Sequence, residues 1–243
     1  MRAKRVPRTC GASCARAAPY DLHAEISRLL FVFWRRSYDR GKTMAAAEKA
    51  RSRGRVRKAV RCYLKVLEHD PADHVVRSKV APLLARVGRW DESRQNFDKA
   101  AAGYLDAGFT PKAIAVWTVA AQTFPEQVEY WERIANEQVK RGKRQDAVLA
   151  LLQGRSMLRN KRQRPLALLL LRQVLELEPG HVDATIDLAD QLRRDGTHDE
   201  AKRLLAGLLV RIGKVRSLRR RVRFAQFRLE PSIRGLLDWA LAR

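Results

Sequence analysis

The sequence predicts an all-α solenoid, an elongated row of helices in which each helical unit covers the apolar face of its neighbours. Residues of one type recur every 54 positions, and signals for β-strands are nearly absent. The recurring positions include Ala59, Ala113 and Ala167, and Gly88, Gly142 and Gly196. Such a period is typical of stacked helical repeats, because a single unit cannot bury its own apolar face.

The spacing of the glycines divides the 54-residue period into 34 and 20 residues. Gly54 to Gly88 is 34 residues, Gly88 to Gly108 is 20, and Gly108 to Gly142 is 34 again. The longer part predicts a helix-turn-helix, and the shorter part predicts a third helix. In the second unit we expect helix A at about 74 to 87, helix B at about 90 to 107 and helix C at about 111 to 124. Pro111 suits the first turn of helix C, where a missing N–H costs nothing.

Several segments in register resemble the tetratricopeptide repeat family. They are GRVRKAVRCYLKVLEHDP (54 to 71), GRWDESRQNFDKAA (88 to 101), GFTPKAIAVWTVAAQTFP (108 to 125), GKRQDAVLALL (142 to 152) and GTHDEAKRLL (196 to 205). The resemblance covers about residues 44 to 231 and implies a right-handed solenoid. Two positions depart from the family pattern: Ser93 replaces a small alanine, and Arg162 stands where a turn glycine is expected.

The resemblance also implies a function. Members of this family generally act as scaffolds that hold a peptide or a partner helix in a groove lined by their A helices. By repeat position, the groove candidates are Ser78, Glu132, Asn136, Ile186 and Asp190. Members that clamp a C-terminal carboxylate use a Lys and an Asn four residues apart, a pair that these positions lack. The chain is therefore expected to bind a protein or peptide partner, but not as an adaptor for chaperone tails.

Residues 1 to 43 lack the repeat pattern and carry ten Lys or Arg against three acids. Two hypotheses remain open for them. One is a disordered basic leader, in which the apolar run from 29 to 34 forms a short docking segment. The other is an over-extended reading frame, because Met44 stands directly before the first repeat. The apolar run lies too far from the basic start for a signal peptide, so secretion is not expected.

The segment after Pro231, residues 232 to 243, predicts a C-terminal capping helix. Ser232 suits an N-cap, and helical spacing places four apolar residues on one face. They are Ile233, Leu236, Leu237 and Ala240, whereas Trp239 and Leu241 lie off this stripe. We expect the stripe to cover the apolar end of the last unit.

Charge is the second informative property of the chain, which has 50 Lys and Arg against 26 Asp and Glu, a formal net charge of +24. Two basic runs fall at corresponding turns between helices B and C, and stacking is expected to place them along one edge. The candidate ridge comprises Arg159, Lys161, Arg162, Arg164, Lys214, Arg216, Arg219, Arg220 and Arg221. Such a ridge attracts nucleic acid or another polyanion by releasing counterions. The competing explanation is a GC-rich genome that fills solvated positions with arginine.

Nothing in the sequence indicates an enzyme. No histidine neighbours a nucleophile in a recognisable arrangement, and no Gly-rich phosphate loop is present. Cys10 and Cys14 carry only a weak suggestion of a metal site, so neither metal nor cofactor is expected. No apolar run reaches the roughly 18 residues that a membrane-spanning helix needs. The sequence therefore predicts a non-catalytic interaction scaffold in the bacterial cytoplasm, with polyanion binding as the alternative.

Overall fold

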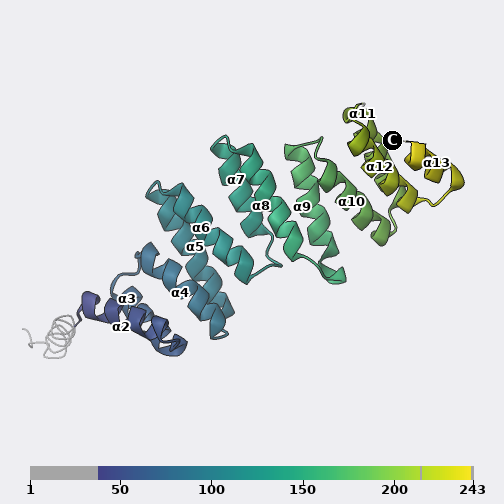
Figure 1. The fold of residues 1–243 in the computed structure, drawn as a ribbon. Helices are drawn as coiled ribbons and strands as arrows, with labels where there is room; N and C mark the ends of the chain where they lie inside the picture. Colours follow the sequence, from purple (N-terminus) through teal and green to yellow (C-terminus); the bar gives the residue numbers. More distant parts are fainter. Residues whose placement is uncertain (1–37, 214, 242–243) are drawn as a thin grey trace, which may run out of the picture.

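The computed structural model describes residues 38–213 and 215–241, and this part of the chain is an elongated array of stacked helices (Figure 1). Successive helices run antiparallel and are joined by short turns. This arrangement is the all-α solenoid that the sequence predicts. The helices are α2 (Arg40–Ser52), α3 (Val56–His69), α4 (His74–Arg86), α5 (Trp90–Asp106), α6 (Thr110–Thr123), α7 (Glu129–Lys140), α8 (Arg144–Met157), the 3₁₀ helix η1 (Lys161–Gln163), α9 (Arg164–Leu177), α10 (Val182–Asp195), α11 (His198–Arg211), α12 (Arg216–Leu229) and α13 (Ile233–Leu241).

The helix boundaries follow the sequence period. The predicted helices A, B and C of the second unit correspond to α4, α5 and α6, each within one residue at either end. The B helices α5, α8 and α11 begin at Trp90, Arg144 and His198, which are 54 residues apart. Each period therefore contains three helices.

Glycine in the left-handed region forms most of the predicted turns. Gly88, Gly142 and Gly196 have φ between 73° and 85°, a conformation that other residues rarely adopt. Arg162 stands where the next such glycine is expected, and the chain uses a different turn there. The 3₁₀ helix η1 forms a capping box, in which the backbone N–H of Asn160 donates to Oε1 of Gln163 at 3.1 Å. A capping interaction thus replaces the left-handed glycine.

The helices form two layers, one of even-numbered and one of odd-numbered helices. Within the even layer, α4 lies directly against α6, and α10 against α12. Ion pairs between alternate helices also join members of one layer. In the even layer these pairs are Glu48–Lys79, Arg155–Asp187 and Asp190–Arg228, and in the odd layer Asp98–Arg133 and Arg172–Glu200. Because a unit has three helices, equivalent helices of successive units fall in opposite layers.

The hydrophobic core extends along the array instead of gathering at one centre. One cluster joins α2, α3 and α4 around the fully buried Tyr63. A longer cluster continues from α4 to α12 and includes the fully buried Phe97 and Trp131. Each helix is thus held by its immediate neighbours, as expected for a solenoid.

The first described helix begins earlier than the predicted boundary between residues 43 and 44. Asp39 caps α2 by accepting a hydrogen bond from the backbone N–H of Lys42 at 2.9 Å. Arg40, in the first turn, forms an ion pair with Asp73 at the start of α4. Residues 40 to 43 therefore belong to the helical array, and the boundary is corrected to lie before α2. The remainder of the predicted leader, residues 1–37, lies outside the described residues.

The C-terminal helix is present, but it packs through a different face from the one expected. The Trp239 ring lies 5.5 Å from the ring of Phe224 on α12, measured between centroids. The guanidinium of Arg220 lies 5.4 Å from the centre of the same indole. Ile233 and Leu237, on the predicted capping stripe, are instead exposed to solvent. An indole offers a larger apolar surface and a cation–π contact, which explains why the half-buried Trp239 faces α12.

The close contact between α7 and α8 allows a test of the packing. A Cβ atom added at Gly154 would lie 2.6 Å from Cγ of the buried Trp131, whereas one added at Gly207 on α11 would meet open space. We expect Gly154→Ala to lower the free energy of unfolding by about 1–3 kcal/mol through overpacking. Gly207→Ala should raise it by about 0.5–1 kcal/mol, because alanine favours a helix. Urea unfolding measures both changes, and similar values for the two variants would contradict the packing of α7 on α8.

Candidate functional site

The even layer is the one in which alternate helices contact one another directly, at α4 with α6 and at α10 with α12. We use "inner face" for the exposed surface of α2, α4, α6, α8, α10 and α12, and "outer face" for the exposed surface of the odd-numbered helices. The groove expected from the family resemblance corresponds to the inner face.

The five groove candidates do not share one face. Ser78 lies on α4, and Ile186 and Asp190 lie on α10, so these three belong to the even layer. Glu132 and Asn136 lie on α7, in the odd layer. Glu132 accepts a hydrogen bond from Nε2 of Gln173 on α9 at 2.6 Å, which places it on the outer face. The expected single groove is therefore corrected: a three-helix period moves equivalent A helices from one face to the other.

At its C-terminal end the inner face is crossed by an ionic network. The carboxylate of Asp190 lies 3.0 Å from Arg193 and 2.8 Å from Arg194 on the same helix, and 3.3 Å from Arg228 on α12. Only a small cavity of about 20 Å³ remains between α10 and α12 beside Ile186. Asp190 and Ile186 therefore hold α12 against α10, and the open part of the inner face lies on α4, α6 and α8.

The open part of the inner face carries exposed apolar side chains on successive even helices. Val75 on α4, Val119 on α6 and Leu149 on α8 are between 41% and 62% exposed. Each lies on the side of its helix opposite the buried residues, such as Val80 on α4 and Leu151 on α8. We call these three side chains the apolar track. Repeat register did not reveal it, because the three residues occupy different positions of the 54-residue period.

An ion pair connects α2 and α4 next to Ser78. Nζ of Lys79 donates to Oε1 of Glu48 at 2.8 Å, and Glu48 also lies 2.9 Å from Arg51. The hydrogen bond from Lys79 holds the pKa of Glu48 below its ordinary value. Ser78 itself donates its hydroxyl hydrogen to the carbonyl of Val75 at 2.8 Å.

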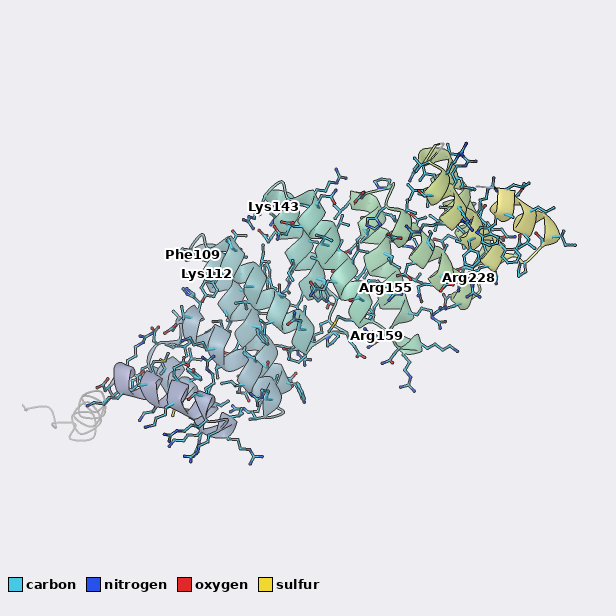
Figure 2. The ribbon with its side chains drawn as sticks, viewed as in Figure 1. Phe109, Lys112, Lys143, Arg155, Arg159 and Arg228 are labelled. Carbon is cyan, nitrogen blue, oxygen red and sulfur yellow. The ribbon has the colours of Figure 1, made fainter. Side chains whose placement is uncertain are left out.

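The predicted basic ridge is divided between two opposite edges of the array. In Figure 2, Arg159 lies at the edge formed by turns that follow even helices, and Lys143 at the edge formed by turns that follow odd helices. We call these the Arg159 edge and the Lys143 edge. The first carries Arg159, Lys161, Arg162 and Arg164, whereas Arg216, Arg219, Arg220 and Arg221 begin α12 at the second. Lys214 lies outside the described residues.

Two hydrogen bonds also show that the two basic runs lie at opposite edges. Arg164, at the start of α9, donates to the carbonyl of Arg194 at 3.0 Å, so the α8–α9 turn adjoins the end of α10. Arg211, at the end of α11, donates to the carbonyl of Pro179 at 2.7 Å, so the α11–α12 turn adjoins the α9–α10 turn. The two basic runs are thus separated by the length of α9, about 20 Å. The single ridge is corrected to two patches, because a three-helix unit reverses the direction of the next B helix.

The Arg159 edge gains cations that the sequence argument missed. Arg193 and Arg194, in the last turn of α10, lie beside the α8–α9 turn through the bond from Arg164. The sequence shows two arginines directly before the turn at Gly196. Their distance in sequence from residues 159 to 164 gave no reason to expect them in the same patch. Asp190 partly neutralises them, whereas Arg159, Lys161 and Arg162 are exposed.

The outer face carries two pockets that the sequence did not predict. One, of about 460 Å³, lies between α5 and α7 and is crossed by the ion pair of Asp98 and Arg133 at 2.6 Å. Tyr130 lines it, and burial raises the pKa of this phenol to about 12. The other, of about 450 Å³, lies between α9 and α11 over Leu204 and Leu208. Both pockets arise between alternate helices of the odd layer, which are farther apart than those of the even layer.

Comparisons with known proteins assign neither a family nor a function to the chain. No protein-family model matches the chain, and no curated protein does. Similar solved structures include the MamA protein (16% identity, 84% of this chain and 89% of that chain, TM-score 0.26) and YrrB, described as a TPR protein with an unusual peptide-binding site (16%, 74% and 90%, 0.33). Human IFIT1 with m7Gppp-AAAA is a third (17%, 76% and 44%, 0.32).

The Glu48–Lys79 pair predicts a pH dependence of stability. A carboxyl group whose pKa is lowered on folding stabilises the protein above its unfolded pKa, and this contribution is lost as pH falls through the folded pKa. Lys79→Met should therefore cost up to about 1 kcal/mol of unfolding free energy at pH 7, because the pair is partly exposed, and progressively less toward pH 3. Urea unfolding across this range measures the effect, with Lys58→Met on α3 as a charge-matched control. Parallel profiles for the wild type and Lys79→Met would refute it.

Antiparallel helix pairs joined by left-handed glycine turns are the features in which this chain resembles the tetratricopeptide repeat family. In fold the described part of the chain is an all-α solenoid of stacked helices.

Proposed function

We propose that this chain is a non-catalytic scaffold of the cytoplasm that holds a peptide or a helix of a partner protein on its inner face. The observation that supports the proposal is the apolar track of Val75, Val119 and Leu149 on three successive even helices. Exposed apolar side chains on successive helices of one face offer separate apolar anchors for a bound peptide or helix.

The charges around the track favour a mixed partner segment. Lys79 of α4 pairs with Glu48 of α2, and Arg155 of α8 pairs with Asp187 of α10 at 2.9 Å. Each pair is internally neutral, so neither pair favours a strongly acidic or strongly basic ligand. Partner specificity in this proposal comes from apolar anchors, with polar contacts from the two pairs.

Capture from an extract of the source organism tests the proposal. The full chain, tagged, should retain one defined protein after nuclease treatment. Val119→Glu combined with Leu149→Glu should weaken its binding by at least about tenfold, because charged side chains would interrupt the apolar anchors. Val210→Glu, on α11 of the odd layer, alters a side chain that is 82% exposed and serves as the control. A partner bound equally well by both variants would contradict binding on the inner face.

A second candidate function is binding of nucleic acid or another polyanion at the Arg159 edge. The bond from Arg164 to Arg194 supports it, because it brings the cations of two turns together on one patch. Phosphate contacts release counterions and need no base reading, so this binding would depend steeply on salt and weakly on sequence.

The two-edge arrangement provides a charge-matched test of the second function. With a labelled single-stranded oligonucleotide, replacing Arg159, Lys161 and Arg162 by alanine should flatten the slope of log K against log salt. The expected change is about 0.7 for each phosphate that the protein no longer neutralises. Replacing Arg141, Lys143 and Arg144, which are exposed at the α7–α8 turn, removes the same charge from the Lys143 edge and should leave the slope nearly unchanged. Equal effects of the two triple variants would indicate attraction by net charge, not a site at the Arg159 edge.

A further inference from the structure

The last helix of the described array presents an apolar stripe to solvent. Helix α13 packs against α12 on the side of Trp239 and Gly235. Its opposite side carries Ile233, Leu236 and Leu237 of the predicted stripe and also Leu241, which that stripe left out. These four side chains are between 44% and 83% exposed. Amphipathic helices of water-soluble domains normally bury such a stripe, and a contiguous exposed one marks an interaction surface.

Positive charge surrounds the stripe. Residues 216 to 241 contain seven arginines and two acids. Both acids already face cations, since Glu230 pairs with Lys202 and Asp238 lies 3.8 Å from Arg223. Arg219 donates to the carbonyl of Gly213 at 2.9 Å, and Arg220 lies over the Trp239 ring, so neither contact neutralises the guanidinium. Arg221 and Arg228 pair with Asp183 and Asp190 of α10. The surface at this end of the array therefore combines exposed aliphatic side chains with Arg219 and Arg220, whose described contacts include no carboxylate.

Exposed aliphatic side chains beside arginines favour some binding partners for the stripe over others. A second copy of the chain would bring two arginine-rich α12 helices together, which like-charge repulsion opposes. A partner helix usually lies in a groove between helices. Helix α13 is instead the outermost helix and lies beyond α12 at the end of the array (Figure 1). A bilayer interface accepts such a helix, because an amphipathic helix lies in its plane with aliphatic side chains among the lipids and cations beside the headgroups.

We propose that the α12–α13 end of the array docks onto the surface of an anionic lipid bilayer. The stripe of Ile233, Leu236, Leu237 and Leu241 enters the interface between headgroups and acyl chains. The arginines at the start of α12 contact lipid phosphates, each contributing attraction to the negative surface. The binding is peripheral: within the described residues, no helix has the length and hydropathy that crossing a bilayer requires.

Sedimentation of the full chain with lipid vesicles tests this docking. We expect binding to vesicles of phosphatidylcholine mixed with phosphatidylglycerol, little binding to phosphatidylcholine alone, and weaker binding as salt is added. Leu236→Asp combined with Leu237→Asp should reduce the partition coefficient by more than about tenfold. The control variant Val210→Asp introduces a negative charge at an exposed position of α11. This variant should bind the anionic vesicles more tightly than the Leu236→Asp, Leu237→Asp variant. Arg219→Gln with Arg220→Gln should weaken binding by about fivefold per charge.

Several results would overturn the proposal. These are no binding to anionic vesicles, equal binding to both vesicle types, or full binding by the Leu236→Asp, Leu237→Asp variant. Sedimentation equilibrium without lipid examines the competing occupant. A dimer of the wild-type chain that this variant dissociates would assign the stripe to a second copy instead. Circular dichroism verifies that each variant keeps its helices, which is expected because the substituted side chains are exposed.

Discussion

Each helix of this array packs chiefly against the helix before it and the helix after it, and this constraint determines where every surface lies. Antiparallel neighbours in a continuous stack must alternate between two layers, and their turns must alternate between two edges. A repeat with two helices would return to the same layer in every unit. The three-helix unit of this chain instead exchanges layers and edges at each period, so sequence equivalence and spatial equivalence differ.

The sequence predicted the helices well because their ends depend on local physics. Glycines that reach positive φ and a proline that suits a first helical turn act within a few residues, so the sequence marked α4, α5 and α6 within one residue. The face on which a residue lies depends on whether its helix is even-numbered or odd-numbered in the array. No local sequence signal shows this. This is why Glu132 was grouped with Ser78, and Arg162 with Arg219, although the structure places the members of each pair on opposite faces or edges.

The terminal helix shows a second limit of sequence patterns. The stripe at 233, 236, 237 and 240 is the regular apolar face of α13, yet the side with the half-buried Trp239 packs against α12. A periodicity argument predicts the buried face from the number of apolar residues on it. The face that packs in the structure depends on the area and chemistry of each contact. An indole between Phe224 and Arg220 gains ring contact and cation–π attraction together. One large aromatic residue can therefore reverse the orientation of a short helix.

The arrangement of charge makes the proposed roles compatible in one molecule. The apolar track lies on α4, α6 and α8, in the middle of the array, whereas the aliphatic stripe of α13 lies at its C-terminal end (Figure 1). The Arg159 edge is separated from the arginines at the start of α12 by the length of one helix, α9. A partner on the inner face would therefore leave α13 free, and docking through α13 would leave the central helices accessible. In such an array, independent surfaces arise because the core is distributed along the axis and each layer needs only its neighbours.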